Sequence, residues 1–339
     1  MTRPRFRWLS RLVALAIVLP VLWLARECGG LAVTDDPVTM NIPRGSTVRA
    51  IADSLSEAGV IASPQAFRWY ASLGNKDRAI KPGRYVFVRG QSWSSVLETL
   101  VQGRGAALTV VIPEGFDLRE IVPTLARTLG VPEDSVRAAA SDTAWKRRLD
   151  VPAATLEGYL FPATYAFPIG STAREAVTAM LERFELVWKP EWDARLQAMS
   201  ISRHDVMTMA SIVEKEARKS EERPIIAAVY WNRIKKGMRL QADPTVQYAM
   251  PAHTERVLYR DLEIDSPYNT YKNAGLPPGP IASPGEASIV AALAPANVPY
   301  LYFVAHPDGH HEFRTTFAEH TKAIAAVKRA ARAAPRPPR

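Results

Sequence analysis

Residues 202–217, SRHDVMTMASIVEKEA, have the pattern of an amphipathic helix with two glutamates near its end. Ser202 and Asp205 form a Ser-x-x-Asp start signal, in which the first side chain can cap the first helical turn. At about 100° per residue, a set of small and apolar residues falls on one stripe. The stripe consists of Val206, Met209, Ala210, Val213 and Ala217. The stretch therefore predicts a helix with one face against a core.

The two glutamates, Glu214 and Glu216, cannot face the same way on this helix. They are separated by about 160° around the axis. Glu216 falls at the edge of the apolar stripe and Glu214 outside it, so the pattern buries Glu216 more. Burial raises the pKa of a carboxyl, as a general acid at neutral pH requires. The alternative is that Glu216 simply pairs with a nearby arginine, such as Arg218, Arg223 or Arg233.

Downstream segments extend this region into a larger mixed α/β domain. A helical pattern runs from about Glu222 to Lys236 and ends at Gly237. Residues 265–285, DSPYNTYKNAGLPPGPIASPG, form a long loop whose tyrosines and prolines favour order. YLYFVA (300–305) predicts a strand, PDGHH a turn and TFAEHTKAIAAVKRA a closing helix. Upstream, a long helical pattern runs to about Leu196.

A repeated pattern organises the N-terminal half. IPRGSTVRAIADSL (42–55) and IPEGFDLREIVPTL (112–125) each fit a strand, a glycine turn and a helix capped by a small polar residue. With GRYVFV (83–88) as a strand and RGQSWSSVLETL (89–100) as a looser echo, residues 38–103 read as strand–helix–helix–strand with one further helix. This order resembles a LysM-type module, a fold that implies binding of glycan strands. The alternative is a structural α+β subdomain without ligand affinity.

The first 33 residues predict a membrane anchor. Residues 12–25 are continuously apolar and follow four arginines. Fourteen residues are fewer than the roughly 20 that span a bilayer, but apolar flanks extend the stretch and arginines can reach the headgroups. A cleaved signal peptide is the alternative, although no clear small-x-small site follows. We expect an uncleaved anchor in the cell inner membrane, with the arginines in the cytoplasm and the rest in the periplasm.

Composition excludes several other functions. The formal charge is +9, and nine cations lie in the first 11 and last 12 residues, so the body is nearly neutral and is not expected to bind nucleic acid. The single cysteine, Cys28, excludes an intrachain disulfide and a cysteine-based metal site. His310 and His311 lack a second set of ligands with metal spacing, so we expect an exposed hairpin there and no metal or other cofactor.

The motifs together resemble the YceG-like family of endolytic murein transglycosylases. The resemblance rests on ASIVEKEA, on ERPIIAAVYWNRIKKGMRLQADPTVQYAM, on PYNTYKNAGLPPGPIASPG and on PYLYFVA, over about 207–320, with LEGYLFPATY upstream. It implies an anchored enzyme that cuts peptidoglycan strands internally, near their synthesis and with peptidoglycan synthases as possible partners. The second glutamate of the family's E-K-E motif is catalytic, which corresponds to Glu216. Ala217 and Ala163 depart from the family, which often has Thr and Asp there.

The implied reaction explains why one carboxyl can suffice. Hydrolytic glycosidases need two carboxylates, whereas a lytic transglycosylase uses the C6 hydroxyl of the sugar as nucleophile and leaves a 1,6-anhydroMurNAc end. An oxocarbenium-like transition state still needs polar groups around the sugar. The candidate substrate-binding residues are Glu214, Asn232, Gln241, Asp243, Tyr268, Asn269 and Tyr271. Turn chemistry is the alternative for Asn269 and for the QADPT segment around Asp243.

We therefore predict four parts. Residues 1–33 are the tail and anchor, 34–104 the LysM-like module, 105–330 the catalytic domain and 331–339 a basic tail. The competing functions are a non-catalytic peptidoglycan-binding or scaffold protein and a muramidase that uses water. No constellation typical of a peptidase is present.

Overall fold

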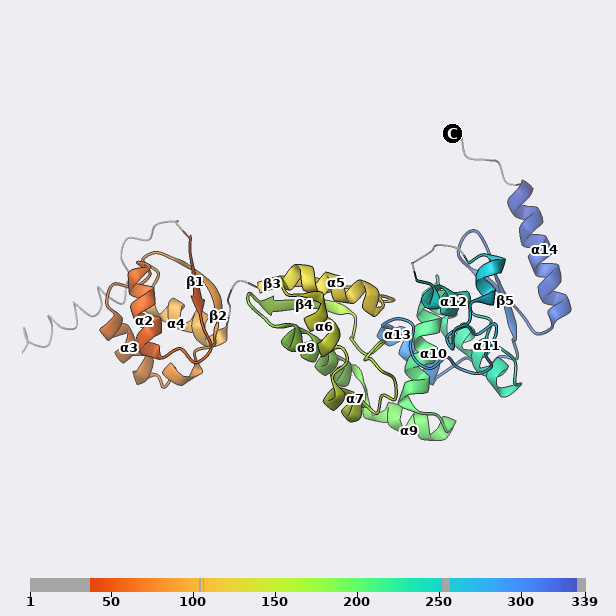
Figure 1. The fold of residues 1–339 in the computed structure, drawn as a ribbon, viewed down its shortest axis with the longest axis horizontal. Helices are drawn as coiled ribbons and strands as arrows, with labels where there is room; N and C mark the ends of the chain where they lie inside the picture. The colour runs from red at the N-terminus through yellow and green to blue at the C-terminus, as the bar shows by residue number, and fades with distance from the viewer. Residues whose placement is uncertain (1–36, 104, 106, 252–256, 334–339) are drawn as a thin grey trace, which may run out of the picture. The chain divides into compact units, whose positions relative to one another are not determined.

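The computed structural model describes residues 37–103, 105, 107–251 and 257–333 (Figure 1). The chain divides into two compact units: one ends at Thr109 and also takes in residues 166–171, and the other consists of 110–165 and 172 onward. In the described part of the chain, helices alternate with short strands that form two-stranded sheets. The predicted mixed α+β class is confirmed.

The first unit has the predicted order of strand, helix, helix, strand and further helix. Its elements are β1 (Pro37–Ile42), α2 (Val48–Glu57), α3 (Pro64–Leu73), η1 (Asp77–Ala79), β2 (Gly83–Val88) and α4 (Trp93–Gln102). β1 and β2 pair antiparallel, with Ile42 opposite Gly83. Trp93 is buried and meets the ring of Phe67 edge-on at 6.4 Å. That the module resembles LysM in more than element order stays a prediction.

The two similar segments fold alike. Gly45 and Gly115 both have φ of +79°, a left-handed conformation that glycine adopts without steric cost. After each turn a polar side chain caps the next helix: Thr47 accepts from an amide of α2, and Asp117 forms a capping box with Glu120. The predicted unit of strand, glycine turn and capped helix is confirmed at both places.

The remaining elements lie in the second unit, except that the strands β3 and β4 have residues in both units. They are β3 (Ala107–Ile112), α5 (Leu118–Leu129), α6 (Glu133–Ala139), α7 (Thr143–Leu149), β4 (Ala163–Pro168), α8 (Ala173–Val187), α9 (Pro190–Met199), α10 (Arg203–Glu216), η2 (Ser220–Glu222), α11 (Arg223–Lys235), α12 (Asp243–Ala249), η3 (Tyr259–Glu263), α13 (Glu286–Leu293), β5 (Tyr302–Ala305), β6 (His311–Arg314) and α14 (Phe317–Ala333). β3 pairs with β4, and β5 pairs antiparallel with β6.

Helix α10 is the centre of this unit and is more deeply buried than predicted. Its start is as expected, with the Ser202 and Asp205 side chains forming a capping box. However, every residue from Val206 to Val213 is buried, so a single apolar stripe is wrong for this part of the helix. The reason is that the residues between the stripe positions are also small or apolar, which lets α13, α11 and α12 pack around α10.

Two predicted elements differ from the structure, each at a proline in the first turn of a helix. The long helical pattern up to Leu196 is two helices, because α8 ends at Val187 and α9 begins at Pro190, a residue suited to a first helical turn. The QADPT turn is instead the start of α12, again with a proline in its first turn. The predicted helix before Gly237 is confirmed as α11, and the predicted strand at 300–305 as β5.

The long loop 265–285 is ordered, as its prolines and tyrosines predicted. Its second half is buried and contacts α10, since the Ile281 amide donates to the Ser211 hydroxyl at 3.0 Å. The Ser283 amide donates to the Phe116 carbonyl at 2.7 Å, which ties the loop to the turn after β3. The loop thereby connects α10 to the turn between β3 and α5.

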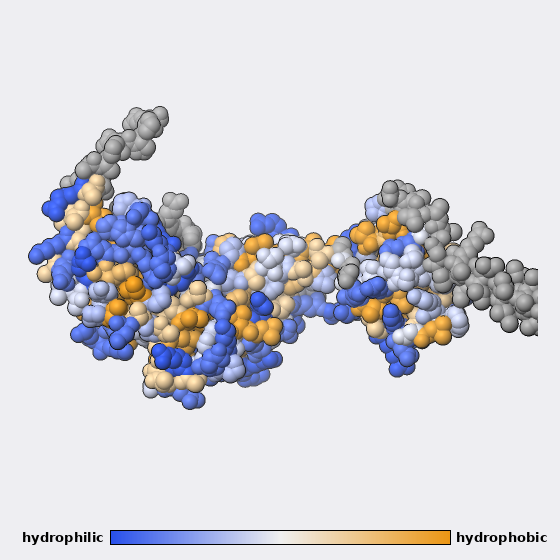
Figure 2. Space-filling view, turned by 180° about the vertical axis from the view of Figure 1, so that it is seen from behind, coloured by the Kyte–Doolittle hydropathy of each residue, from blue (hydrophilic) through white to orange (hydrophobic). Residues whose placement is uncertain are grey.

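The predicted anchor and the basic tail from residue 334 lie outside the described residues. Within the described part, no helix combines the length and apolar character needed to cross a bilayer. The boundary predicted at 104 and 105 stays a prediction. On the face shown in Figure 2, hydrophobic residues are interspersed with hydrophilic ones.

Candidate active site

Glu216 is the last residue of α10, and a tyrosine of α11 holds its carboxyl. The Tyr230 hydroxyl donates a hydrogen bond to Glu216 Oε1 at 2.8 Å. Tyr230 is 1% exposed, and its ring meets Phe303 of β5 edge-on at 5.8 Å. Because the phenol is fixed by its surroundings, it holds one carboxyl oxygen of Glu216 in a defined position.

The pKa of Glu216 is raised to about 7, chiefly because burial disfavours its charged form. The hydrogen bond from Tyr230 and the positive charges of Arg233 and Arg218 act the other way, and the charge of Asp243 raises the pKa further. Glu216 forms no ion pair with any residue that the structure describes, so the arginine pairing considered above is wrong. Its pKa thus lies well above the usual range of a glutamate.

Arg233 is a buried cation close to this carboxyl. Its Nε donates to the Leu301 carbonyl at 2.7 Å and its Nη1 to the Leu240 carbonyl at 2.5 Å. The guanidinium also lies over the ring of Tyr302, 5.3 Å from its centre. In the described part of the chain these partners include no carboxylate, so the charge of Arg233 acts on Glu216 without being neutralised by a direct ion pair.

Glu214 lies in a polar cluster of its own. Its carboxylate accepts from Ser288 Oγ at 2.7 Å and from the Gly285 amide at 3.1 Å, and it pairs with Arg223 at 3.4 Å. The Glu214 side chain is 8% exposed, so the expectation that it lies off the buried face is wrong. Glu114 also lies near, and burial together with the charge of Glu214 raises its pKa. Glu214 thus anchors the fold, and a substrate-binding role for it stays a prediction.

Asp243 and Tyr271 come together beside Glu216. The Tyr271 hydroxyl donates to Asp243 Oδ1 at 2.6 Å, and the charge of Glu216 contributes to a raised pKa of Tyr271, whose main cause is burial. Asp243 is exposed, so substrate can reach it. Gln241, just before it, is exposed and has a left-handed φ of +52°, with its amide donating to the Thr270 carbonyl.

Asn232 and Asn269, two residues predicted to bind substrate, form hydrogen bonds within the fold. The Asn232 amide donates to the carbonyls of Val298 and Tyr300, which fixes the segment before β5. Asn269 is completely buried, and its amide donates to two carbonyls of residues 262–264. The amide groups of Asn232 and Asn269 thus stabilise the fold, and the Asn269 contacts support the loop-shaping alternative. A substrate-binding role for either residue stays a prediction.

Tyr268 belongs to a second buried cluster. Its ring lies 4.8 Å from that of Tyr248, whose hydroxyl donates to Glu157 at 3.2 Å. Glu157 lies in the LEGYLFPATY motif and accepts from the Leu118 amide at the start of α5. Burial raises the pKa of Glu157 to about 8. This cluster ties α5 to α12, and it leaves Tyr268 half-buried at its edge.

The predicted hairpin is formed by β5 and β6, but His311 in it is buried instead of exposed. This residue is 7% exposed, and its Nδ1 lies 2.6 Å from Glu222 Oε2 while its amide donates to the other carboxylate oxygen at 2.9 Å. The ring meets Phe303 edge-on at 5.2 Å. The pair thus supports the phenylalanine that packs against Tyr230. Among the described residues no group of three or more His, Cys, Asp or Glu side chains could hold a metal ion.

The sequence did not reveal the partners of either glutamate. Tyr230 follows Glu216 by 14 residues and looks, in sequence, like one apolar residue of a helix. Ser288 and Gly285 follow Glu214 by more than 70 residues, and no periodicity connects them. One signal in the sequence could have indicated such partners. The pattern of α10 places several polar side chains in a largely apolar helix, and each buried polar group needs a hydrogen-bond partner.

The chain is similar to known proteins over most of its length. The model of the YceG-like family matches residues 40–326. The endolytic murein transglycosylase of Bacillus subtilis (strain 168) is 38% identical over 301 residues, which are 84% of this chain and 83% of that protein. The endolytic murein transglycosylase of Streptococcus pneumoniae serotype 2 is 31% identical over 299 residues, 79% of this chain but 54% of that protein.

A solved structure shows the same relationship. The crystal structure of a yceG-like protein from Listeria monocytogenes is 34% identical, with a TM-score of 0.60 over 86% of this chain and all of that one. The matches cover both units, including α10 and the segments around it. The chain belongs to the YceG-like family.

Proposed function

We propose that this chain is a peptidoglycan lytic transglycosylase that cuts within glycan strands, with Glu216 as its acid and base. The names of the relatives support the activity and substrate class. The single observation that supports the role of Glu216 is its environment: a carboxyl with a pKa near 7, held through one oxygen by Tyr230. A group that must first give and then take a proton works best with a pKa near the working pH.

In the first step Glu216 acts as the acid. Because the Tyr230 hydroxyl donates to Oε1, the proton of the neutral carboxyl resides on Oε2. Oε2 transfers this proton to the oxygen between MurNAc and GlcNAc, and the bond from that oxygen to the MurNAc C1 breaks. Positive charge develops at C1 as the leaving sugar departs.

In the second step Glu216 acts as the base. The C6 hydroxyl of the same MurNAc attacks C1, and the Glu216 carboxylate takes the hydroxyl proton. The product is a 1,6-anhydroMurNAc end, Glu216 is protonated again, and no water is consumed. Tyr230 and the charges of Arg233 and Arg218 stabilise the carboxylate between the two steps. Asp243 and Tyr271 face the sugar and its developing charge in this scheme.

A muramidase that uses water is the second candidate, and one observation favours it. Asp243 is an exposed second carboxylate whose charge acts on Glu216, and hydrolytic glycosidases use two carboxylates. Mass spectrometry of the products separates the two reactions. Anhydro ends support the transglycosylase, whereas reducing MurNAc ends would make the enzyme a muramidase.

A non-catalytic wall-binding protein is the third candidate, and Ala217 and Ala163 keep it open. Purified protein incubated with murein sacculi distinguishes it from an enzyme. Release of soluble fragments supports the proposed activity. Binding to sacculi without release would favour the scaffold.

The N-terminal parts serve this activity in our proposal. Residues 1–33 anchor the chain in the inner membrane, with the catalytic domain in the periplasm near peptidoglycan synthases, where cleavage would end strand elongation. The LysM-like module holds glycan, and Trp69 on α3, 56% exposed, offers a flat apolar face of the kind that sugars contact. Separate expression of residues 34–104 and a pull-down with sacculi tests this role; no retention would contradict it.

A further inference from the structure

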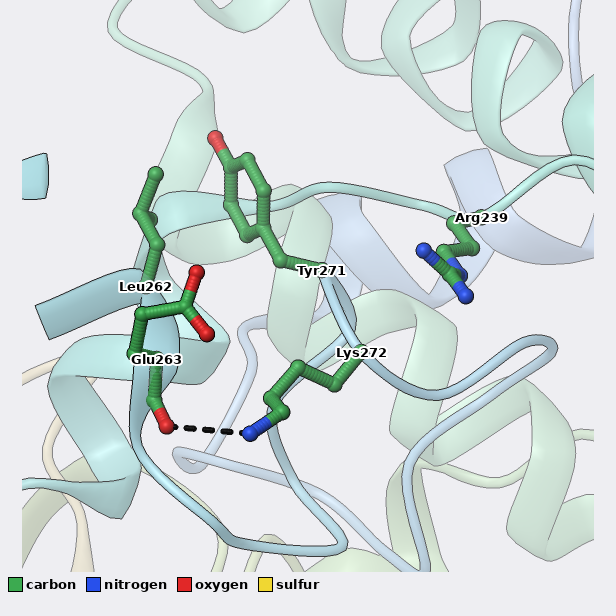
Figure 3. Close-up of a pocket in the computed structure, with 5 residues that line it drawn as sticks. All are labelled: Arg239, Leu262, Glu263, Tyr271 and Lys272. Atoms are coloured by element: carbon green, nitrogen blue, oxygen red, sulfur yellow. Dashed lines mark hydrogen bonds between the residues drawn. The ribbon is translucent and has the colours of Figure 1, made fainter.

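A pocket of about 390 Å³ opens beside the proposed catalytic site. It is lined by Arg239, Leu262, Glu263, Tyr271 and Lys272. Figure 3 shows Leu262 and Glu263 on one side and Arg239 on the other, with Tyr271 and Lys272 between them. Tyr271 belongs to both places, because its hydroxyl donates to Asp243, whose charge acts on Glu216. A ligand in this pocket would therefore lie one side chain away from the site of cleavage.

The charged groups of this pocket form no ion pair with any residue that the structure describes. Arg239 is exposed and makes no hydrogen bond or ion pair with any residue that the structure describes. Lys272 donates once, to the main-chain carbonyl of Glu263 at 3.1 Å, which leaves two of its three N–H groups available. The Glu263 carboxylate likewise has no ion pair in the described part of the chain. Two cations and one anion thus face an open pocket without partners of opposite charge.

We infer that this pocket binds the peptide carried by the glycan substrate, and so makes the enzyme specific for peptide-bearing strands. The inference rests on the proposed function. Murein peptides carry several carboxylates and, before cross-linking, the free amino group of a diamino acid. Arg239 and Lys272 match the carboxylates, since a guanidinium binds a carboxylate through two parallel hydrogen bonds. Glu263 matches the ammonium.

The sugar backbone fits this pocket less well than the peptide. Glycan rings are neutral apart from the lactyl group, and proteins bind such rings through aromatic faces and neutral polar groups. Leu262 and the ring of Tyr271 supply an apolar wall, but the three charges would gain nothing from a neutral sugar. The pocket therefore provides recognition of the peptide that is separate from recognition of the glycan.

The test compares murein strands with their peptides and murein strands without them. Uncrosslinked murein strands are used intact, and the same strands are used after an amidase has removed their peptides and left free lactyl carboxylates. kcat/KM is measured for wild type, Arg239→Gln, Lys272→Gln and, as a matched control, Lys322→Gln, which removes an exposed lysine on α14. A charged hydrogen bond contributes about 1.5–3 kcal/mol, which corresponds to roughly ten- to hundredfold in affinity.

We expect kcat/KM of each pocket variant to fall about tenfold on peptide-bearing strands and less than about twofold on peptide-free strands. The control variant should keep the wild-type kcat/KM on both substrates. Equal losses on both substrates, or no loss on either, would overturn the inference. The tetrapeptide released by the amidase gives a second measurement by calorimetry: it should bind wild type and bind Arg239→Gln at least about fivefold more weakly. A wild type that cleaves neither substrate would instead overturn the proposed function, and tetrapeptide binding would still test the pocket.

Discussion

Two carboxyl groups in one helical turn of α10 have opposite surroundings. Glu214 is held by a hydroxyl, an amide and a guanidinium. Glu216 has one neutral donor, Tyr230, and burial that favours its protonated form. The same type of side chain thus has three polar partners on one side of the helix and a single phenol partner, with a raised pKa, on the other. The neighbours, not the residue type, decide which glutamate can do chemistry.

The comparison also explains the spacing of the E-K-E motif. The two glutamates point to different sides of the helix, so one side can be reserved for structure and the other for reaction. The Glu214 cluster fixes α10 to the start of α13 through Gly285 and Ser288. A fixed α10 in turn holds Glu216 in place relative to Tyr230 on α11.

The largest effect is expected for Glu216→Gln. Glutamine keeps the shape of the side chain but cannot give a proton, so kcat/KM should fall by about a thousandfold. Release of soluble fragments from murein, followed by chromatography, measures the loss. The matched control is Glu221→Gln, which changes an exposed glutamate of η2 and should leave the rate unchanged. Retention of more than about a tenth of the activity by Glu216→Gln would contradict the assignment.

Tyr230→Phe should have the next largest effect on activity. It removes the hydrogen bond that lowers the pKa of Glu216, so this pKa rises above its value of about 7. Because the acid must be protonated, the fall of kcat/KM at alkaline pH should move to higher pH. At pH 7 the loss of orientation should lower the rate by about tenfold. An unchanged pH profile would show that Tyr230 does not act through Glu216.

Glu214→Gln should affect stability more than activity. Arg223 would lose its carboxylate partner in a largely buried place, which should lower the free energy of unfolding by about 1–3 kcal/mol. Urea unfolding followed by circular dichroism measures this change. The rate at a temperature where the variant is folded should fall only a few-fold. If a folded Glu214→Gln variant lost as much activity as Glu216→Gln, the assignment of a structural role to Glu214 and a catalytic role to Glu216 would be contradicted.

Ala217→Thr is expected to have the smallest effect. Ala217 follows Glu216 and ends α10 through a main-chain bond from its amide to the Val213 carbonyl, which threonine can also make. We therefore expect kcat/KM to change by less than about twofold. A gain of tenfold or more would show that a hydroxyl at this position takes part in the reaction and that this chain lacks it.

The helices and turns around this site were predictable from adjacent residues, whereas the partners of its polar side chains come from distant parts of the sequence. The Ser-x-x-Asp start, the glycine turns and the length of α11 were predictable, because capping and turn geometry depend on adjacent residues. The burial of Glu214 was not predictable, because its partners come from another helix start more than 70 residues later. The main-chain partners of Asn232 and Asn269 and the burial of His311 were not predictable for the same reason. The partners of these residues are main-chain or side-chain groups on other segments of the chain. No periodicity in the sequence indicates that these segments lie close to them.

The end of α10 has one more consequence for the proposed reaction. The peptide dipoles of a helix add up to roughly half a negative charge at its C-terminal end, where Glu216 lies. Such a field disfavours a nearby carboxylate, typically by about 0.3–1 kcal/mol. After Glu216 has protonated the leaving sugar, the helix itself favours recovery of the proton from the C6 hydroxyl. In the proposed cycle, the dipole of α10 thereby favours the protonated form of Glu216, which is the form needed for the next round of cleavage.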